Sequence, residues 1–110
     1  MSIPLSPPFL DLLARRLAAI AEPNRIRILA HLEKREATVQ ELTDELATTH
    51  QNVSKHLGVL LGSGIVTRRK DGNKAWYSLA DYSACRLIEQ ATASVTGYVE
   101  ELACIAGLDG

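Results

Sequence analysis

The sequence lacks the features of a membrane protein, a secreted protein or a disordered chain. No apolar run approaches the roughly 18 residues of a membrane-spanning helix, so we expect no membrane partner. The first residues lack the charged front and apolar middle of a secretory signal, which predicts a cytoplasmic protein. Hydrophobic residues make up 46% of the 110 residues and charged residues 23%, a balance typical of globular proteins. We therefore expect one domain, residues 1–110, that needs no disulfide to stabilise its core.

The usual signatures of an enzyme are also missing. We find no nucleophile paired with a base, no phosphate-binding glycine loop and no pair of carboxylates in a suggestive setting. His31, His50 and His56 each lack a partner at metal-ligand spacing. We expect His31 to be structural and His56 to lie on the helix edge towards the core. The sequence thus predicts no catalysis and no cofactor.

The sequence has almost no net charge, since its formal value is −1, but the charged residues are distributed unevenly along the chain. Residues 1–49 hold six basic and seven acidic residues, and residues 78–110 hold one basic and five acidic. Residues 50–77, in contrast, hold five basic residues and one acidic residue. A local basic stretch of this kind is the electrostatic footprint of a nucleic-acid-binding surface. A solvated hairpin with chance Lys and Arg would give the same charge, so the helix pattern must decide.

Residues 38–62 show the pattern of two short helices joined by a tight turn. Thr38 and Glu41 form a capping box, which predicts a helix that runs to about Ala47. A hydroxyl of the turn at residues 48–50 can cap the second helix, which we expect to end at the glycines of residues 62–64. Helical spacing predicts buried faces formed by Val39, Leu42 and Leu46 and then by Val53, Leu57, Leu60 and Leu61. The pair predicts a helix-turn-helix whose second helix has an opposite face of Gln51, Ser54, Lys55 and Gly58.

The next residues show the pattern of a β-hairpin. Asp71-Gly72-Asn73 is a turn sequence, because Gly and Asn tolerate the positive φ of a tight hairpin. Residues 65–67 and 76–79 are rich in β-branched and aromatic side chains, which predicts two strands. The basic side chains beside the turn are Arg68, Arg69, Lys70 and Lys74. A basic hairpin after a helix-turn-helix predicts a winged helix-turn-helix, which is mainly α with a small β-hairpin wing.

Three further helices complete the predicted fold. The first begins near Pro7 and Pro8 and ends at about Ala21, and Asn24 is expected to cap the second. The second helix should bury Ile26, Leu29 and Leu32 and leave Arg25 and Arg27 outside. The last helix, capped by Asp81, has an apolar face wider than one small domain needs to bury. We expect this face to form a homodimer, although it can instead cover the first helix. The predicted dimer residues are Phe9, Leu13, Leu17, Leu87, Ala91, Val95, Tyr98, Leu102 and Ile105.

The order and spacing of these segments resemble the ArsR-type winged-helix repressors. The segments that carry the resemblance are Ala21-Glu22-Pro23-Asn24-Arg25-Ile26-Arg27-Ile28-Leu29, Val53-Ser54-Lys55-His56-Leu57-Gly58-Val59-Leu60 and Arg69-Lys70-Asp71-Gly72-Asn73-Lys74-Ala75-Trp76-Tyr77. The likeness spans about residues 17–81. It implies a homodimeric bacterial repressor, with dimer contacts through the first and last helices, that leaves its operator when an inducer binds.

The metal ligands of that family are missing when they are compared residue by residue. Thr38 and Gln40 stand where one family site has two cysteines, and both are poor ligands for soft metals. A second site on the last helix keeps only Asp81, with Ser83, Ser94 and Gly97 at the other ligand positions. We therefore predict no metal site.

Cys85 and Cys104 leave one alternative open. They lie 19 residues apart on one predicted helix, about 28 Å, and cannot join within a chain. Across an antiparallel pair of last helices they can approach each other and form a redox or thiophilic-metal switch. The simpler interpretation is two ordinary buried cysteines in a reducing cytoplasm.

The predicted function is binding to a palindromic operator in double-stranded DNA. Gln51 and Asn52 are the expected base readers, because a carboxamide can bond adenine through two atoms. Lys55 can read guanine or hold a phosphate. The phosphate-binding candidates are Thr49, His50 and Ser54 on the helix and Arg68, Arg69, Lys70 and Lys74 on the wing. A small-molecule inducer is possible, and the competing class is a winged-helix module that binds protein.

Overall fold

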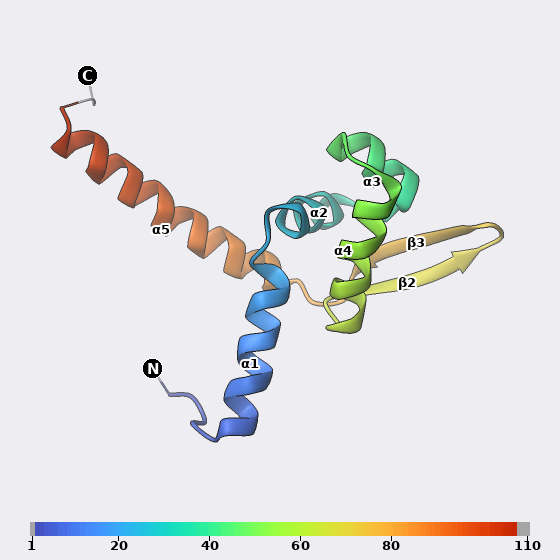
Figure 1. The fold of residues 1–110 in the computed structure, drawn as a ribbon, viewed down its shortest axis with the longest axis horizontal. Helices are drawn as coiled ribbons and strands as arrows, with labels where there is room; N and C mark the ends of the chain where they lie inside the picture. The colour runs from blue at the N-terminus through green and yellow to red at the C-terminus, as the bar shows by residue number, and fades with distance from the viewer. Residues whose placement is uncertain (1, 108–110) are drawn as a thin grey trace.

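The computed structural model describes residues 2–107, which form five helices and a three-stranded sheet. The elements are α1 (Pro7–Ile20), α2 (Pro23–Lys34), β1 (Ala37–Thr38), α3 (Val39–Leu46), α4 (His50–Gly62), β2 (Val66–Asp71), β3 (Lys74–Leu79) and α5 (Ser83–Ile105). In Figure 1, α2, α3 and α4 gather into one body, the β2–β3 hairpin extends from it, and α1 and α5 point away. This arrangement confirms the predicted winged helix-turn-helix.

Side-chain caps define the helix-turn-helix as predicted. The hydroxyl of Thr38 accepts a hydrogen bond from the backbone N–H of Glu41 at 3.1 Å, at the start of α3. The hydroxyl of Thr49 accepts from the N–H of Asn52 at 3.1 Å, at the start of α4. Between the helices, Ala47 takes up a left-handed conformation with φ of 51°, which ends α3 abruptly. The turn therefore results from local backbone and capping chemistry.

The sheet is larger than the predicted hairpin. Its strand order is β1-β3-β2, all antiparallel, and Ala37 and Thr38 of β1 pair with Tyr77 and Trp76 of β3. The sequence prediction missed β1, because two residues are too few to show an alternating pattern. The prediction also made the wing strands too short, since β2 continues through the basic residues to Asp71. Gly72, with φ of 62°, forms the turn where positive φ was expected.

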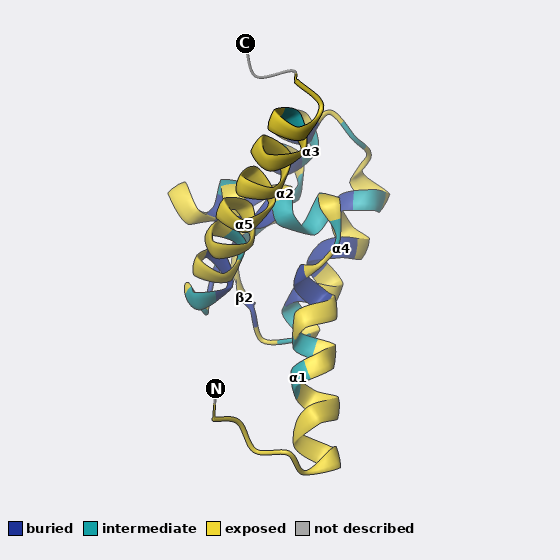
Figure 2. Cartoon of the chain, turned by 90° about the vertical axis from the view of Figure 1, so that its left-hand side faces the viewer, coloured by how far each residue is buried: buried dark blue, intermediate teal, exposed yellow. Residues whose placement is uncertain are grey.

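The core lies between α2, α3, α4 and the base of the hairpin. Its largest fully buried side chains are Ile28, Leu29, Leu32, Leu42, Val53, Leu57, Leu60, Ile65 and Val66. Figure 2 shows this burial on α2 and α4, whereas α1 and α5 are mostly exposed. Ile28 was not among the predicted core residues but is fully buried, because α2 is enclosed on more than one side. Ile26, which was predicted to be buried, is only partly buried.

Two predictions about the start of α2 are wrong. The N-cap is Glu22 and not Asn24, and the Glu22 carboxylate accepts the N–H of Arg25 at 2.8 Å. Pro23 takes the first helical position, where its missing N–H costs nothing, and so the cap lies two residues upstream of the predicted one. Arg25, expected outside, is partly buried and points towards α1 and α4.

The apolar faces of α1 and α5 remain largely uncovered. Along the described length of α5, the fully buried residues are Ala84 and Cys85, while Tyr98 is 61% and Ile105 77% exposed. α5 packs on α2 and diverges from α1, so it does not cover the first helix (Figure 1). Within residues 2–107, no helix is both long and apolar enough to cross a membrane.

Candidate nucleic-acid interface

α4 has one face in the core and one face in solvent. Val53, His56, Leu57 and Leu60 are buried, whereas Gln51, Ser54, Lys55 and Gly58 are exposed. A Cβ atom added at Gly58 would meet no atom within 4 Å, so this face is open along its middle. The sequence-predicted polar face thus exists as one continuous exposed strip. Its groups can hydrogen-bond the edges of bases or the phosphates of a duplex.

The N-terminal turn of α4 is tied to the helix before it. The ring Nε2 of His50 lies 2.6 Å from Oε1 of Gln40, and Nε2 of Gln40 donates to Asp44 at 2.8 Å. Asn52 is partly buried and its amide nitrogen donates to the hydroxyl of Thr48 at 3.1 Å. The two predicted base readers therefore differ in availability. Gln51 is exposed, whereas one side-chain N–H of Asn52 is already hydrogen-bonded within the turn.

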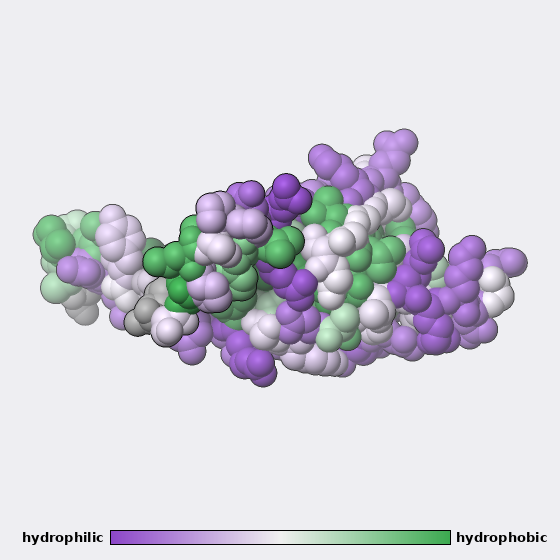
Figure 3. Space-filling model, turned by 90° about the horizontal axis from the view of Figure 1, so that it is seen from below, coloured by the Kyte–Doolittle hydropathy of each residue, from purple (hydrophilic) through white to green (hydrophobic). Residues whose placement is uncertain are grey.

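The wing displays the predicted basic side chains in solvent. Arg68, Lys70 and Lys74 are exposed, and Figure 3 shows the wing end of the molecule as hydrophilic. Arg69 is 56% exposed, but its guanidinium pairs with Glu36 at 2.9 Å and approaches Asp71 at 3.8 Å. The positive charge of Arg69 is therefore partly neutralised within the chain.

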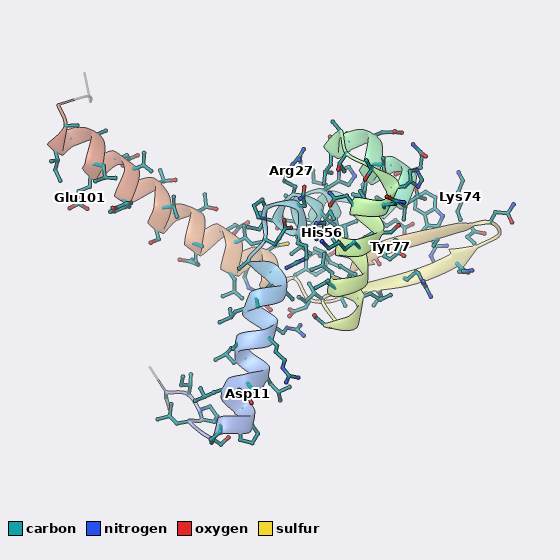
Figure 4. The ribbon with its side chains drawn as sticks, in the orientation of Figure 1. Asp11, Arg27, His56, Lys74, Tyr77 and Glu101 are labelled. Atoms are coloured by element: carbon teal, nitrogen blue, oxygen red, sulfur yellow. The ribbon has the colours of Figure 1, made fainter. Side chains whose placement is uncertain are left out.

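The aromatic pair of the wing belongs to its packing. Tyr77 is buried and lies opposite Arg68 in the β2–β3 ladder, and Trp76 is partly buried opposite Arg69. Figure 4 shows Tyr77 at the base of the hairpin and Lys74 farther out along it. These rings support the hairpin that carries the charges.

Charged groups behind α4 were missed by the sequence prediction. The guanidinium of Arg25 reaches the Ala18 and Ala19 carbonyls of α1 and the His56 ring of α4. Burial opposes ionisation of Glu22, but hydrogen bonds from the Arg25 N–H and from Asn24, together with the nearby Arg25 charge, keep the pKa of its carboxyl below the usual value. A signal was present, since a cation close behind a helix end can bind the last carbonyls of that helix.

A second arginine joins the outer elements. Arg16 of α1 donates to the Ser63 carbonyl at 2.6 Å and to the Asp81 carboxylate at 2.7 Å. Hydrogen bonds from Ser83, and then from Arg16, lower the pKa of Asp81 to about 2. The Asp81 carboxylate also accepts the N–H of Ser83 at 3.0 Å. The N-cap of α5 is Tyr82 and not Asp81 as predicted; Asp81 lies one residue upstream, from where its carboxylate binds the first residue of the helix.

Three residues at the family's metal-ligand positions make other hydrogen bonds. Thr38 caps α3, Gln40 bonds His50 and Asp44, and Asp81 is occupied by Arg16 and Ser83. Across the described part of the chain, no three side chains of the His, Cys, Asp or Glu type cluster as a metal site would. A thiophilic pair gains no support either. Burial, followed by the nearby Glu33, raises the pKa of the Cys85 thiol to about 11, so it is not a reactive thiolate.

The fold and this site define a winged helix-turn-helix DNA-binding regulator. Residues 20–69 match a family model described as a helix-turn-helix domain. The Mycobacterium tuberculosis HTH-type transcriptional repressor SmtB is 35% identical over 94 residues, which cover 84% of this chain and 70% of SmtB. A probable mercury resistance operon repressor of Streptomyces lividans is 30% identical over 100 residues, 91% of this chain and 80% of that protein.

Solved structures agree with these relatives. The crystal structure of M. tuberculosis Rv0081 superimposes with a TM-score of 0.75 at 35% identity, covering 89% of this chain and 99% of that one. The solution structure of Mb0332 from Mycobacterium bovis, a homodimeric winged helix-turn-helix domain described as a possible ArsR-family regulator, gives 0.73 at 26% identity, covering 84% and 86%. The chain belongs to the ArsR family of transcriptional regulators.

Proposed function

We propose that two copies of this chain form a repressor that binds a palindromic operator and leaves it when an effector binds. The observation that carries the proposal is the exposed polar strip of α4 beside a basic wing. A helix with one buried and one polar face can enter the major groove while the wing lies along the backbone. Such a protein would work in the cytoplasm, beside the chromosome.

Base reading is assigned first to Gln51. Its exposed carboxamide can offer both an acceptor and a donor to adenine. Asn52 keeps its oxygen and one N–H for a base, while its other N–H stays on Thr48. Lys55 is exposed one turn after Gln51 and can reach guanine or a phosphate. Sequence preference should therefore depend on Gln51 more than on Asn52.

Phosphate binding is assigned to the rest of the predicted site. Thr49 and Ser54 offer hydroxyls, and the positive end of the α4 dipole favours an anion near His50. On the wing, Arg68, Lys70 and Lys74 add attraction that is independent of sequence, and Arg69 contributes less because of Glu36.

We expect the second copy of the chain to pack on the uncovered apolar faces of α1 and α5. A cavity of about 560 Å³ opens between α1, α2 and α5. Four of the predicted dimer residues, Leu17, Leu87, Ala91 and Val95, line it. In Figure 3, apolar side chains gather over the middle of the molecule and at the end opposite the wing. A partner copy that covers these faces would place two α4 helices on successive major grooves, roughly 34 Å apart.

An effector would act where the copies meet. Displacement of α1 or α5 would change the spacing of the two reading helices, and so the affinity for the operator. A small molecule suits this role better than a metal or a thiol switch, since the described residues provide no metal cluster and Cys85 is buried.

The competing class, a module that binds protein, is weakened by where the apolar side chains lie. Large exposed apolar residues are concentrated on α1 and α5, and on α4 the exposed one is Val59, at 37%. Protein-binding hot spots are usually aromatic or apolar anchors, which the polar strip does not provide.

The test is an anisotropy titration of the reduced, metal-free protein with its own upstream DNA and a scrambled duplex at two salt concentrations. We expect tight, salt-sensitive binding that favours the upstream DNA. Gln51→Ala should relax base preference. Lys70→Ala should weaken binding to both duplexes by a similar factor and reduce the slope of the salt dependence by about 1. Lys34→Ala, on α2, is the matched charge control. Absence of binding at low salt would favour the protein-binding module.

A further inference from the structure

Three helices meet at the side chain of Arg25. We propose that Arg25, acting through His56, is a positioning residue that fixes the recognition helix α4 relative to α1 and thereby sets the affinity for DNA. The proposal rests on the proposed function, because it assigns α1 to the dimer and α4 to the operator. Neither Arg25 nor His56 belongs to the exposed strip of α4.

Arg25 completes the C-terminal end of α1. A helix leaves its last four carbonyls without a partner inside the helix. Here the carbonyl of Leu17 accepts from the N–H of Ala21 at 3.0 Å, and that of Ile20 from Glu22 at 2.8 Å.

The other two carbonyls are bound by the arginine. Nε of Arg25 donates to the Ala19 carbonyl at 2.6 Å, and a terminal nitrogen donates to Ala18 at 3.3 Å. The guanidinium is thus held against the end of α1 by at least two bonds, and its direction follows from them.

The remaining contact of the guanidinium is with α4. A terminal nitrogen of Arg25 lies 3.1 Å from Nδ1 of His56, whose side chain is 6% exposed. Arginine can only donate, so Nδ1 must accept, and the ring is neutral with its proton on Nε2. Glu22 lies 3.6 Å from the same Nδ1, which is too long for a hydrogen bond. The Glu22 carboxylate instead accepts the backbone N–H of Arg25 and so fixes the backbone of that residue.

These contacts place α4 at two points along its length. His56 lies mid-helix, where Figure 4 shows it inside the body of the molecule. At the C-terminal end of α4, the Ser63 carbonyl accepts a hydrogen bond from Arg16 of α1 at 2.6 Å. A stiff helix held at two points has a defined direction. A shift at the end of α1, where Ile20 and Ala21 line the cavity described above, therefore moves Arg25 and with it α4.

The experiment compares substitutions that preserve charge. Arg25→Lys keeps the charge but cannot span Ala18, Ala19 and His56. Arg27→Lys is the matched control, since Arg27 lies on the same helix and donates to the Leu46 carbonyl of α3. We expect Arg25→Lys to weaken operator binding about tenfold or more, and Arg27→Lys to stay within about twofold. Affinity is measured by anisotropy where melting and sedimentation show a folded protein in the same oligomeric state as the unsubstituted chain.

Histidine substitutions break the link at its other end. His56→Leu removes the acceptor while leaving the bonds from Arg25 to α1, and should weaken operator binding as Arg25→Lys does. His56→Asn restores an acceptor near the position of Nδ1 and should recover part of the affinity, which filling a core position would not explain. The double variant Arg25→Lys with His56→Leu should bind no worse than the weaker single variant. Multiplied losses, or a folded Arg25→Lys protein that binds within twofold of the unsubstituted chain, would overturn the proposal.

A measurement without DNA separates this proposal from the function on which it rests. Hydrogen exchange of the amides of residues 53–60 should quicken in Arg25→Lys and in His56→Leu, relative to the amides of α3. If the unsubstituted protein binds no duplex, the proposed function fails while exchange still tests the link. Unchanged protection of α4 in both variants would refute the positioning role.

Discussion

Acid should weaken this fold in part through the carboxylate of Asp81. Hydrogen bonds from Ser83 and Arg16 lower the pKa of Asp81 from 3.8 to about 2, so the folded state favours the ionised form. Since one pKa unit corresponds to about 1.36 kcal/mol, the full change is equivalent to about 2.4 kcal/mol. The side chains of Asp81 and Arg16 are 32% and 40% exposed, and solvent screens their interaction. We therefore expect a contribution of about 1 kcal/mol.

The sign follows from the lowered pKa. The contribution is fully present above the unfolded pKa of 3.8 and is lost as the pH falls towards about 2, with roughly half lost near pH 3. Urea unfolding at fixed protein concentration should show Asp81→Asn less stable by about 1 kcal/mol at pH 6, and the gap should close between pH 4 and pH 2. Asp44→Asn, at an exposed acceptor of Gln40, is the control. A gap for Asp81→Asn that stays constant with pH would refute the reasoning.

Four further predictions concern the core, the cap, the strip and the thiols. Leu57→Ala, at a fully buried site, should lower the free energy of unfolding by about 2–5 kcal/mol in denaturant titrations. Thr49→Ala should cost about 1 kcal/mol in the same assay, while Thr49→Ser keeps the cap on Asn52. Gly58→Ala should raise the melting temperature, because its Cβ meets open space, yet weaken operator binding measured by anisotropy if this face meets DNA. Mass spectrometry after alkylation at pH 8 should find exposed Cys104 modified well before buried Cys85, and equal rates would contradict the burial.

Local chemistry explains why so much of this fold could be predicted. The caps at Thr38 and Thr49, the apolar spacing of α3 and α4 and the turn at Gly72 involve residues within a few positions of one another. Such signals are readable in one dimension, because the partners are neighbours in the chain. The polar strip of α4 follows from the same periodicity, since the side opposite a buried face must be in solvent.

Other features needed the tertiary structure because their partners are distant in sequence. Arg25 and His56 are 31 residues apart, and Arg16 and Asp81 are 65 apart, so no periodicity links them. β1 is a strand because it pairs with the edge of β3. Arg69 and Glu36 likewise form an ion pair because folding brings them together. The sequence by itself therefore determined the helix-turn-helix, its wing and the strip that faces solvent, since these depend on local hydrogen bonds and spacing. Only the packing of the elements decided which charges remain in solvent and which arginines join the helices, because burial and pairing depend on neighbours brought together by folding.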